Sequence, residues 1–348
     1  MKGNSDMGIE ILEGGFFTTV QDGGRHAYQQ YGMPVGGAMD THCMALANIL
    51  IGNPIHTEVL EMTYTGVVMR FHESNYFAVV SHGVDIKLSG TSLHPNRAYL
   101  AQKGDTLSIG TVSEGCRAYL ALAGGLNLPV VMGSKSTYIK GKLGGYHGRN
   151  LRSGDRISFL APKTQLANAD FRVIPTSLFP KLSPILRVIL GPQLDAFTPE
   201  GVQTFLQEPY TISANSDRMG YRFSGPFIAH KPGINGNIIS DAIAFGAVQV
   251  PGEGHPIVMM ADRQTTGGYT KIANVISVDL PTLAQMRPGQ TVHFQQISLV
   301  KAHELIARRS QQYEFLQHLL DHETIEKDLH MHLKIESIGY QVDVHQIG

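Results

Sequence analysis

A group of side chains able to do chemistry stands between an apolar run and a pair of glycines, in "MMADRQTTGGYTKIA", residues 259–273. A carboxylate, a guanidinium, an amide and a hydroxyl follow one another there as Asp262, Arg263, Gln264 and Thr265. A carboxylate can move a proton, a guanidinium can bind a carboxylate or phosphate, and an amide can hydrogen-bond another amide. The segment therefore predicts a site for a small, flat, polar ligand.

The preceding residues look like a strand, and we expect that strand to end in the wall of a pocket. Pleating would send Asp262 and Gln264 to one face and the residues beside them to the other. The glycines at 267–268 would let the backbone come close to a small ligand. An acid and a base also arrive together at Asp217 and Arg218.

Other polar clusters adjoin glycines earlier in the chain. An alternative interpretation is that these acids only cap the backbone N–H groups of turns. We prefer that interpretation for Asp22, Asp155 and Asp279, but it explains Asp217 and Asp262 less well. The remaining candidates are Arg25 and Asp40 in "QDGGRHAYQQYGMPVGGAMD", Asn53 and Glu61 in "LIGNPIHTEVLEMTYTG", Lys135 and its hydroxyl neighbours in "MGSKSTY", and Arg149, Arg222 and Gln249.

Several well-known catalytic signatures are absent from the sequence. "GSKST" at 133–137 resembles the end of a phosphate-binding loop, but Ser134 separates Gly133 from Lys135 and position 128 is Leu instead of Gly. No G-x-S-x-G, H-E-x-x-H or paired C-x-x-C motif occurs, so no metal site is predicted. No Met-Lys-Met triplet occurs, so we expect no biotin attached to this chain.

Short runs of β-branched and aromatic residues with Gly, Pro and Asp at their borders dominate up to residue 298, which predicts a mainly β fold. Two helices are expected at 39–52, with Asp40 or Thr41 as N-cap, and at 194–209. Residues 299–348 are rich in charge and in helix-forming residues and predict a helical tail.

A weak internal repeat suggests two similar β-barrels. "LEMTYTGVVMRF" precedes "KGDTLSI" in the first half, much as "SDAIAFGAVQV" precedes "PGQTVHF" in the second. The proline-rich stretch 161–183 lies between them. We therefore expect domains at 7–160 and 184–298, followed by the tail at 299–348.

The composition argues against several kinds of partner and location. The chain of 348 residues has 28 basic and 29 acidic residues, so neither nucleic acid nor an anionic membrane is expected to bind it. Its apolar stretches are broken by Gly and Pro, and its first residues do not resemble a secretory signal. The two cysteines, Cys43 and Cys116, are expected to be buried thiols. A cytoplasmic protein is predicted.

Six motifs, in this order, resemble the allophanate-hydrolase-subunit-2 family, also called the biotin-dependent carboxyltransferase family. They cover about residues 7–298 and read "QDGGRHAYQQYGMPVGGAMD", "ANILIGNP…EVLEMTYTG", "AGGLNLPVVMGSKSTY", "GGYHGRNLRSGD", "SDRMGYRFSGP" and "GAVQVPGEGHPIVMMADRQTTGGYTKIANVISVDLPTLAQMRPGQTVHF". The resemblance implies two β-barrel subdomains of cyclophilin-like fold and a partner chain of the subunit-1 type. The tail after residue 298 is longer than the resemblance accounts for.

The resemblance also implies one of three activities. One branch of the family moves a carboxyl group from carboxybiotin to the nitrogen of urea. Another, the C subunit of 5-oxoprolinase, works with subunits A and B to open the lactam of 5-oxoproline to L-glutamate with ATP. A third is non-enzymatic and antagonises an inhibitor of a sensor kinase. We expect the second, because no biotin carrier is fused to this chain, with the ATP site shared with the partner subunits.

The chemistry of opening a lactam assigns provisional roles to the candidate residues. Arg25 or Arg218 would hold the substrate carboxylate, because a planar fork matches it in a bidentate manner. Lys135 would balance phosphate or oxyanion charge, and Asp217 or Asp262 would be the acid or base. The predicted substrate-binding set is completed by Gln264, Thr265, Tyr269 and Asp40.

Overall fold

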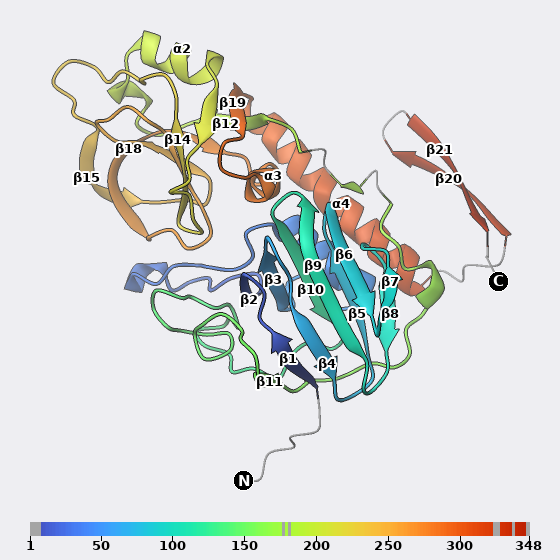
Figure 1. Ribbon diagram of the computed structural model, residues 1–348. Helices are drawn as coiled ribbons and strands as arrows, with labels where there is room; N and C mark the ends of the chain where they lie inside the picture. Colours follow the sequence, from blue (N-terminus) through green and yellow to red (C-terminus); the bar gives the residue numbers. More distant parts are fainter. Residues whose placement is uncertain (1–7, 176–177, 180–181, 323–327, 336–337, 346–348) are drawn as a thin grey trace.

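The computed structural model describes residues 8–175, 178–179, 182–322, 328–335 and 338–345. The fold is mainly β with a few helices and a C-terminal helix, as the sequence predicts (Figure 1). Its sheets fall into two halves: two sheets are built from the first half of the chain, and a barrel from the second half.

The first half contains two sheets around a shared apolar core. A six-stranded sheet has the order β11-β1-β4-β9-β6-β7, and a five-stranded sheet has the order β2-β3-β10-β5-β8. Apolar side chains from both sheets, such as Ile11, Met69 and Leu120, form one buried cluster. The strands are β1 Ile9–Glu13, β2 Phe17–Gln21, β3 Val59–Thr63, β4 Val68–Phe71, β5 Asn75–Val80, β6 Gly83–Leu88, β7 Thr91–Leu93, β8 Ala98–Ala101, β9 Thr106–Glu114, β10 Arg117–Leu122 and β11 Arg156–Ile157.

The second half is a closed barrel of seven strands in the order β12-β19-β13-β14-β17-β16-β18, with β12 and β18 paired to close it and β15 added to the outer edge of β18. Its strands are β12 Ile185–Leu190, β13 Tyr210–Ile212, β14 Gly220–Ser224, β15 Asn237–Ala242, β16 Ala247–Val250, β17 Ile257–Met259, β18 Thr266–Val275 and β19 Thr291–Gln296. All seven pairings of the closed barrel are antiparallel except β12 with β19.

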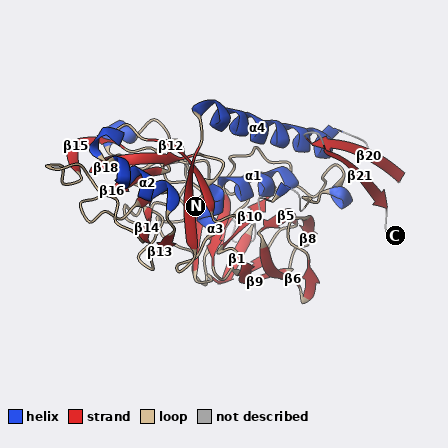
Figure 2. Cartoon of the chain, turned by 90° about the horizontal axis from the view of Figure 1, so that it is seen from above, coloured by secondary structure: helices blue, strands red, loops and turns tan. Residues whose placement is uncertain are grey.

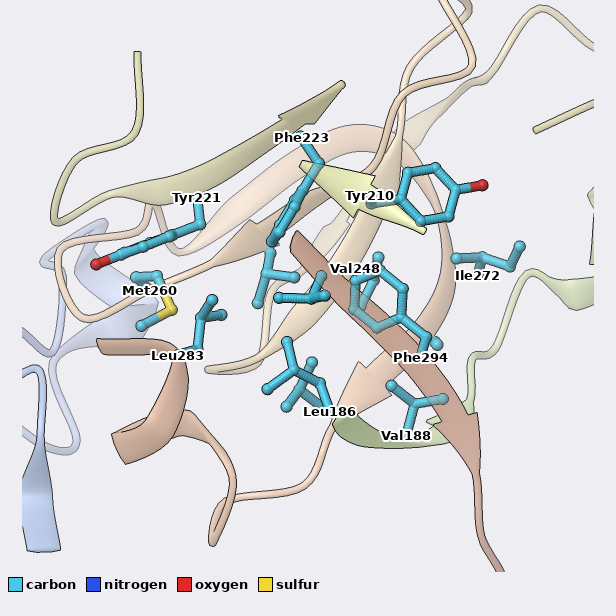
Figure 3. Close-up of a cluster of buried hydrophobic side chains, with 14 of the residues drawn as sticks. Leu186, Val188, Tyr210, Tyr221, Phe223, Val248, Met260, Ile272, Leu283 and Phe294 are labelled. Carbon is cyan, nitrogen blue, oxygen red and sulfur yellow. The ribbon is translucent and has the colours of Figure 1, made fainter. Parts of the chain in front are cut away.

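The interior of the barrel is filled by side chains and is not a binding cavity. Leu186, Tyr210, Val248 and Phe294 come from different strands and point into one cluster (Figure 3). Phe294 stacks on Phe205 with ring centroids 4.5 Å apart. A small barrel is normally filled in this way, so a ligand site in this half must lie outside the barrel interior.

Four α-helices accompany the sheets in the described part of the chain: α1 Thr41–Leu50, α2 Pro199–Gln207, α3 Leu280–Gln285 and α4 Leu299–His322. The Asp40 side chain caps α1 by accepting hydrogen bonds from the backbone of His42 and Cys43, as the sequence predicts. Short 3₁₀ turns occur at Gln29–Tyr31, Ala169–Phe171 and Leu194–Ala196. Helix α4 runs from the barrel to the first half and lies over α1 (Figure 2).

Two predictions about elements are wrong. The sequence predicts a helical tail up to residue 348, but α4 ends at His322, and β20 Asp328–Ile335 then pairs with β21 Ile338–His345 in an antiparallel hairpin. The sequence also predicts that the polar residues 262–265 continue a strand, but they lie in the connection between β17 and β18. Their side chains therefore do not alternate between two faces of a sheet.

Among the described helices, none combines the length and the apolar character needed to cross a bilayer.

Candidate functional site

A buried ion pair lies where the two halves of the molecule meet. Arg218 lies just before β14, and Asp262 follows β17, so the pairing of these strands brings the two residues together. Arg218 Nε donates to Asp262 Oδ2 at 3.0 Å and Nη2 donates to Oδ1 at 2.9 Å. The same guanidinium crosses to the first half, where it donates to Glu61 Oε1 and, at 2.7 Å, to the carbonyl oxygen of Gly37.

The electrostatics of this cluster favour the charged guanidinium. Burial alone would lower the pKa of Arg218, but the carboxylates of Asp262 and Glu61 raise it well above its usual value. Glu61 also accepts hydrogen bonds from the Met39 backbone at 2.7 Å and from the Tyr119 hydroxyl at 2.9 Å. These donors pair with the oxygens of the buried carboxylate.

Arg25 lies beside this ion pair and retains one free donor. Its side chain is fully buried, with Nε donating to the carbonyl of Val131 at 3.0 Å and Nη2 donating to that of Ser136 at 2.7 Å. Its Nη1 is buried and has no partner among the described residues. Burial lowers the pKa of Arg25, while the charges of Asp22 and Asp262 oppose that effect.

Gly36 brings the two charged groups to one place. A Cβ atom at Gly36 would lie 3.7 Å from Asp262 Oδ1 and 3.8 Å from Arg25 Nη1, so glycine leaves the space next to both groups clear. Gly36 has a φ of +65°, and its N–H donates to the carbonyl of Ala261 at 3.1 Å. Nη1 of Arg25 and Oδ1 of Asp262 thus both lie near the same backbone position, Gly36. A guanidinium N–H donates to an oxygen, and a carboxylate accepts from an N–H.

Lys135 is carried by the 134–136 loop, and its ammonium group is already engaged. Lys135 Nζ donates to Glu58 Oε1 at 2.8 Å and to the carbonyl of Leu126 at 2.7 Å. The loop is held by Asp22, which accepts from the Lys135 N–H at 2.6 Å and from the hydroxyls of Ser134 and Ser136. The turn interpretation of Asp22 agrees with these contacts.

Segment 133–137 does not fit the phosphates of ATP. The N–H groups of residues 134–137 donate within the protein, to the carbonyl of Val131, to Asp22, to the Ser134 hydroxyl and to the carbonyl of Val20. A phosphate loop needs such N–H groups free to point at the ligand. ATP is therefore not assigned to this segment.

The structure places the other candidates as follows. Asp217 is exposed, and its carboxylate accepts hydrogen bonds from the backbone N–H groups of Met219 and Gly220 at 2.8 and 3.2 Å, within its own turn. Tyr269 is 40% exposed on β18, where it pairs with Asn237 of β15. Gln264 and Thr265 are half-buried in the β17–β18 connection, next to Asp262.

Arg263, which the sequence places within the same cluster, points away from it. Its Nε donates to the carbonyl of Ile243 at 3.1 Å and its Nη1 to that of Met260 at 3.3 Å, while its guanidinium lies 5.3 Å from the centre of the Phe245 ring. Burial lowers the pKa of Arg263 to about 10. Arg263 therefore anchors the loop that presents Asp262 and Gln264.

Asp40 belongs to the buried hydrogen-bond network that joins α1 to α3. It caps α1 and also accepts from Gln285 Nε2 at 2.7 Å. Ligand atoms of Asp40, Cys43 and His82 lie within 4.8 Å of one another. Because Asp40 already accepts three N–H groups, and burial together with Asp40 raises the pKa of the Cys43 thiol well above its usual value, we interpret the three as a hydrogen-bonded cluster and not as metal ligands.

Sequence reasoning missed several residues that hold the site. Arg117 of β10 donates to the Tyr221 hydroxyl at 3.0 Å, and Gln285 of α3 accepts from the backbone of Cys116 and Arg117 at 3.1 and 2.9 Å. For Arg117 the available signal was a single charged residue inside the apolar strand "CRAYLAL", because such a charge needs a buried partner. Glu61, a candidate from the sequence, lies in the same buried network.

An open hollow of about 520 Å³ lies over β6, β7 and β9 in the first half. Its walls are formed by residues 84–87, 92–95, 108 and 110–111, and none of the candidate residues lines it. It is therefore separate from the charged cluster.

Comparison with known proteins agrees with the two-part architecture. The profile of the family described as "Carboxyltransferase domain, subdomain A and B" matches residues 31–296. The C subunit of 5-oxoprolinase from Escherichia coli (strain K12) is 36% identical over 309 residues, which are 89% of this chain and 97% of that protein. Its counterpart from Haemophilus influenzae is 34% identical over 85% of this chain and 94% of that protein.

Larger proteins contain a similar part. Urea amidolyase from Lachancea kluyveri is 33% identical over 85% of this chain but only 17% of its own length. The crystal structure of Kluyveromyces lactis urea carboxylase superposes with a TM-score of 0.84 and 28% identity, over 99% of this chain and 33% of that one. With the profile matched over both halves and these relatives matched over most of the chain, this protein belongs to the carboxyltransferase-domain family and is similar to components of enzyme complexes.

Proposed function

We propose that this chain is the C subunit of a bacterial, cytoplasmic, ATP-dependent 5-oxoprolinase, which opens the lactam of 5-oxoproline to L-glutamate together with subunits A and B. The observation that carries the proposal is the match to the Escherichia coli relative over 97% of that protein's length. The urea amidolyase relative, by contrast, shares only 17% of its length with this chain.

The carbonyl carbon of a resonance-stabilised amide is a poor electrophile, so the reaction requires that this carbon be activated. Water adds to the carbonyl carbon, the C–N bond of the ring breaks, and the nitrogen leaves with a proton as the free amine. ATP, bound in the complex, would supply the free energy by transferring its terminal phosphoryl group to the amide oxygen, which leaves ADP. After the ring opens, a second water would release that group as inorganic phosphate. The groups on this chain would hold the ring and move the proton.

Arg25 and Asp262 are the residues we assign to the reacting ligand. The free Nη1–H of Arg25 would donate to a substrate oxygen in a buried setting, where such a donor stabilises developing negative charge strongly. Asp262 would accept the ring N–H or a proton of the attacking water. Arg218 would hold the Asp262 carboxylate in place, with Glu61 on its other side.

The other sequence candidates receive supporting roles in this proposal. Asp217 would shape the turn that delivers Arg218, and Lys135 would hold the 134–136 loop through Glu58. Asp40 would support the same network through α1. Gln264, with Thr265 and Tyr269 further along the same segment, would contact the amide.

Reconstitution of the complex tests the proposal. The chain is purified with subunits A and B, and release of glutamate from 5-oxoproline is measured with and without ATP. We expect glutamate only when all three subunits and ATP are present. Failure to release glutamate, with transfer of carboxyl groups to urea when a biotinylated carrier is supplied instead, would replace the proposal by carboxyl transfer.

A further inference from the structure

One buried side-chain amide of the barrel takes no part in the hydrogen-bond network described above. Gln249 of β16 is only 1% exposed, and its Nε2 has no hydrogen-bond partner among the described residues. Leaving a buried donor unpaired destabilises the fold. Such a donor either destabilises the folded chain or hydrogen-bonds to an acceptor atom of a ligand.

Two side-chain amides and one methyl group converge on the backbone of Gly267. A Cβ atom at Gly267 would lie 2.8 Å from Gln249 Nε2, 2.5 Å from Ile243 Cδ1 and 3.4 Å from Gln264 Nε2. Only glycine lets these three groups come so close to the chain at this position. A methyl group there would push the ends of Gln249 and Ile243 away from their present places, whereas Gln264 Nε2 would be at contact distance.

The second amide, Gln264, lies near the same backbone position as the first. Gln264 is half-buried and makes no side-chain hydrogen bond within the part of the chain that the structure describes. Its neighbour Arg263 fixes the loop by binding two backbone carbonyls, so Gln264 stands on an anchored segment. Rotation of Gln264 would open a path to Gln249, and two amide N–H donors that converge on one point suit a carbonyl or carboxylate oxygen.

This point lies close to the charged cluster along the chain. Gln264 is two residues from Asp262, so their Cα atoms are at most about 7.6 Å apart. In the subsite proposed below, Gln249 and Gln264 would hold one oxygen of a small ligand while Arg25 and Asp262 contact another part of it.

We propose that Gln249 and Gln264 form an oxygen-binding subsite beside Gly267, which takes the carbonyl or carboxylate oxygen of a small amide. The inference rests on the proposed function for the identity of that amide, 5-oxoproline, and adds to it the groups that select for an oxygen at this position. Ile243 provides the apolar wall against which the ring carbons lie.

Methyl-detected NMR of the full chain, labelled at isoleucine Cδ1, tests the subsite without requiring turnover. Ile243 Cδ1 lies at the same point as the two amides, so its signal reports occupancy directly. We expect the signal to shift when 5-oxoproline is added to the wild-type chain. The shift should be lost in Gln249→Met, which keeps the length of the side chain but removes the donor, and in Gly267→Ala, which displaces Gln249 Nε2 from its present place.

A matched control exists one residue further along β18. A Cβ atom at Gly268 would meet only the carbonyl of Ile238 at 3.4 Å and the Ser240 hydroxyl at 3.9 Å, and neither glycine has a positive φ. Gly268→Ala should therefore keep the wild-type response. In the reconstituted complex, Gly267→Ala should raise KM for 5-oxoproline at least tenfold, and Gly268→Ala less than twofold.

The outcomes separate the subsite from the proposed substrate. A shift with urea but not with 5-oxoproline would support the subsite and contradict the proposed substrate. No shift with either compound, or an unchanged shift in Gly267→Ala, would overturn the subsite, even if the complex releases glutamate.

Discussion

Arg218 shows how one side chain can join two halves of a molecule. Its guanidinium contacts Asp262 in the barrel and Glu61 in the first half, and all three residues are buried. An exposed ion pair contributes little to stability, because water and salt screen it. A buried pair that loses one partner instead leaves an uncompensated charge in the interior.

Replacement of Arg218 should therefore be costly. Arg218→Met removes the partner of two buried carboxylates, and we expect the free energy of unfolding to fall by about 3–5 kcal/mol. Urea denaturation at pH 7 measures it. Lys301→Ala, which breaks the exposed pair with Glu304 at 3.0 Å, serves as the control and should leave stability nearly unchanged. Equal, small losses in both variants would contradict the buried role of Arg218.

The contacts of single site residues can be predicted from the sequence only in part, and the reason is physical. The sequence shows that Asp262 and Gln264 stand together, because they are neighbours in the chain. It does not show that Arg218 pairs with Asp262 across 44 positions or that Lys135 pairs with Glu58 across 77. Those contacts depend on which strands lie side by side, and the lengths of the connecting loops do not encode that.

At the scale of elements, helix α4 is held on α1 by a buried histidine. His42 Nδ1 lies 2.6 Å from the Tyr313 hydroxyl, and its Nε2 lies 2.9 Å from the carbonyl of Leu178. The His42 and Tyr313 rings stack with centroids 5.5 Å apart. Burial lowers the pKa of His42 to about 4; Arg309 and His82 act in the same direction, whereas Asp40 opposes them.

This contact should make stability depend on pH. The pKa of His42 is lower in the folded chain than its unfolded value of about 6.5, so the unfolded chain takes up a proton first as the pH falls. The stabilisation is complete above about pH 6.5 and is lost towards pH 4. We expect a loss of about 2 kcal/mol between pH 7 and pH 5, measured by urea denaturation at both values.

The matched variant for this prediction is His42→Gln, which keeps hydrogen-bonding groups but does not titrate. It should be less stable than the wild type at pH 7 and should show a smaller loss between pH 7 and pH 5. The same loss in wild type and variant would assign the pH dependence to other groups.

Helices and strands can be predicted from the sequence where one local pattern is present. The prediction is less accurate where a helix pattern and a strand pattern occur in the same segment. The strands up to residue 298 and the Asp40 cap of α1 follow from β-branched runs and from capping chemistry. The high charge of the tail favours helix throughout. Yet "DLHMHLKI" at 328–335 alternates apolar and polar residues, the period of a strand, and it forms β20.

At the scale of the whole molecule, the halves are joined by buried contacts that act as one unit. Gln285 of α3 bonds Asp40 and the backbone of Cys116 and Arg117, all in the first half. Met39 of the first half packs into the core of the barrel. The proposed site depends on this junction, because Arg25 and Asp262 come from opposite sides of it.

Replacement of Gln285 should therefore destabilise contacts in the first half. Gln285→Leu leaves one carboxylate oxygen and two N–H groups unpaired, at roughly 1–3 kcal/mol for each buried group. We expect faster hydrogen exchange in β10 although the substitution lies in α3. Gln290→Leu, whose exposed amide accepts only from the Arg287 backbone, is the control. Unchanged exchange in β10 would show that the halves are energetically independent.

The docking of the two halves lies beyond prediction from the sequence. The weak repeat and the family resemblance point to two β subdomains, and the barrel and the paired sheets agree with a division of that kind. How they meet depends on isolated buried charges, Glu61, Arg117 and Arg218, whose partners are found only in three dimensions.

The central claim is that Arg25 and Asp262, brought together by that junction, act on one small amide. The most direct test is kcat/KM for ATP-dependent release of glutamate by the reconstituted complex that contains Arg25→Lys. Lysine keeps the charge but lacks the planar fork that binds two carbonyls and a ligand at once. We predict a fall of about 100-fold with the complex still assembled; a value within threefold of wild type would contradict the account.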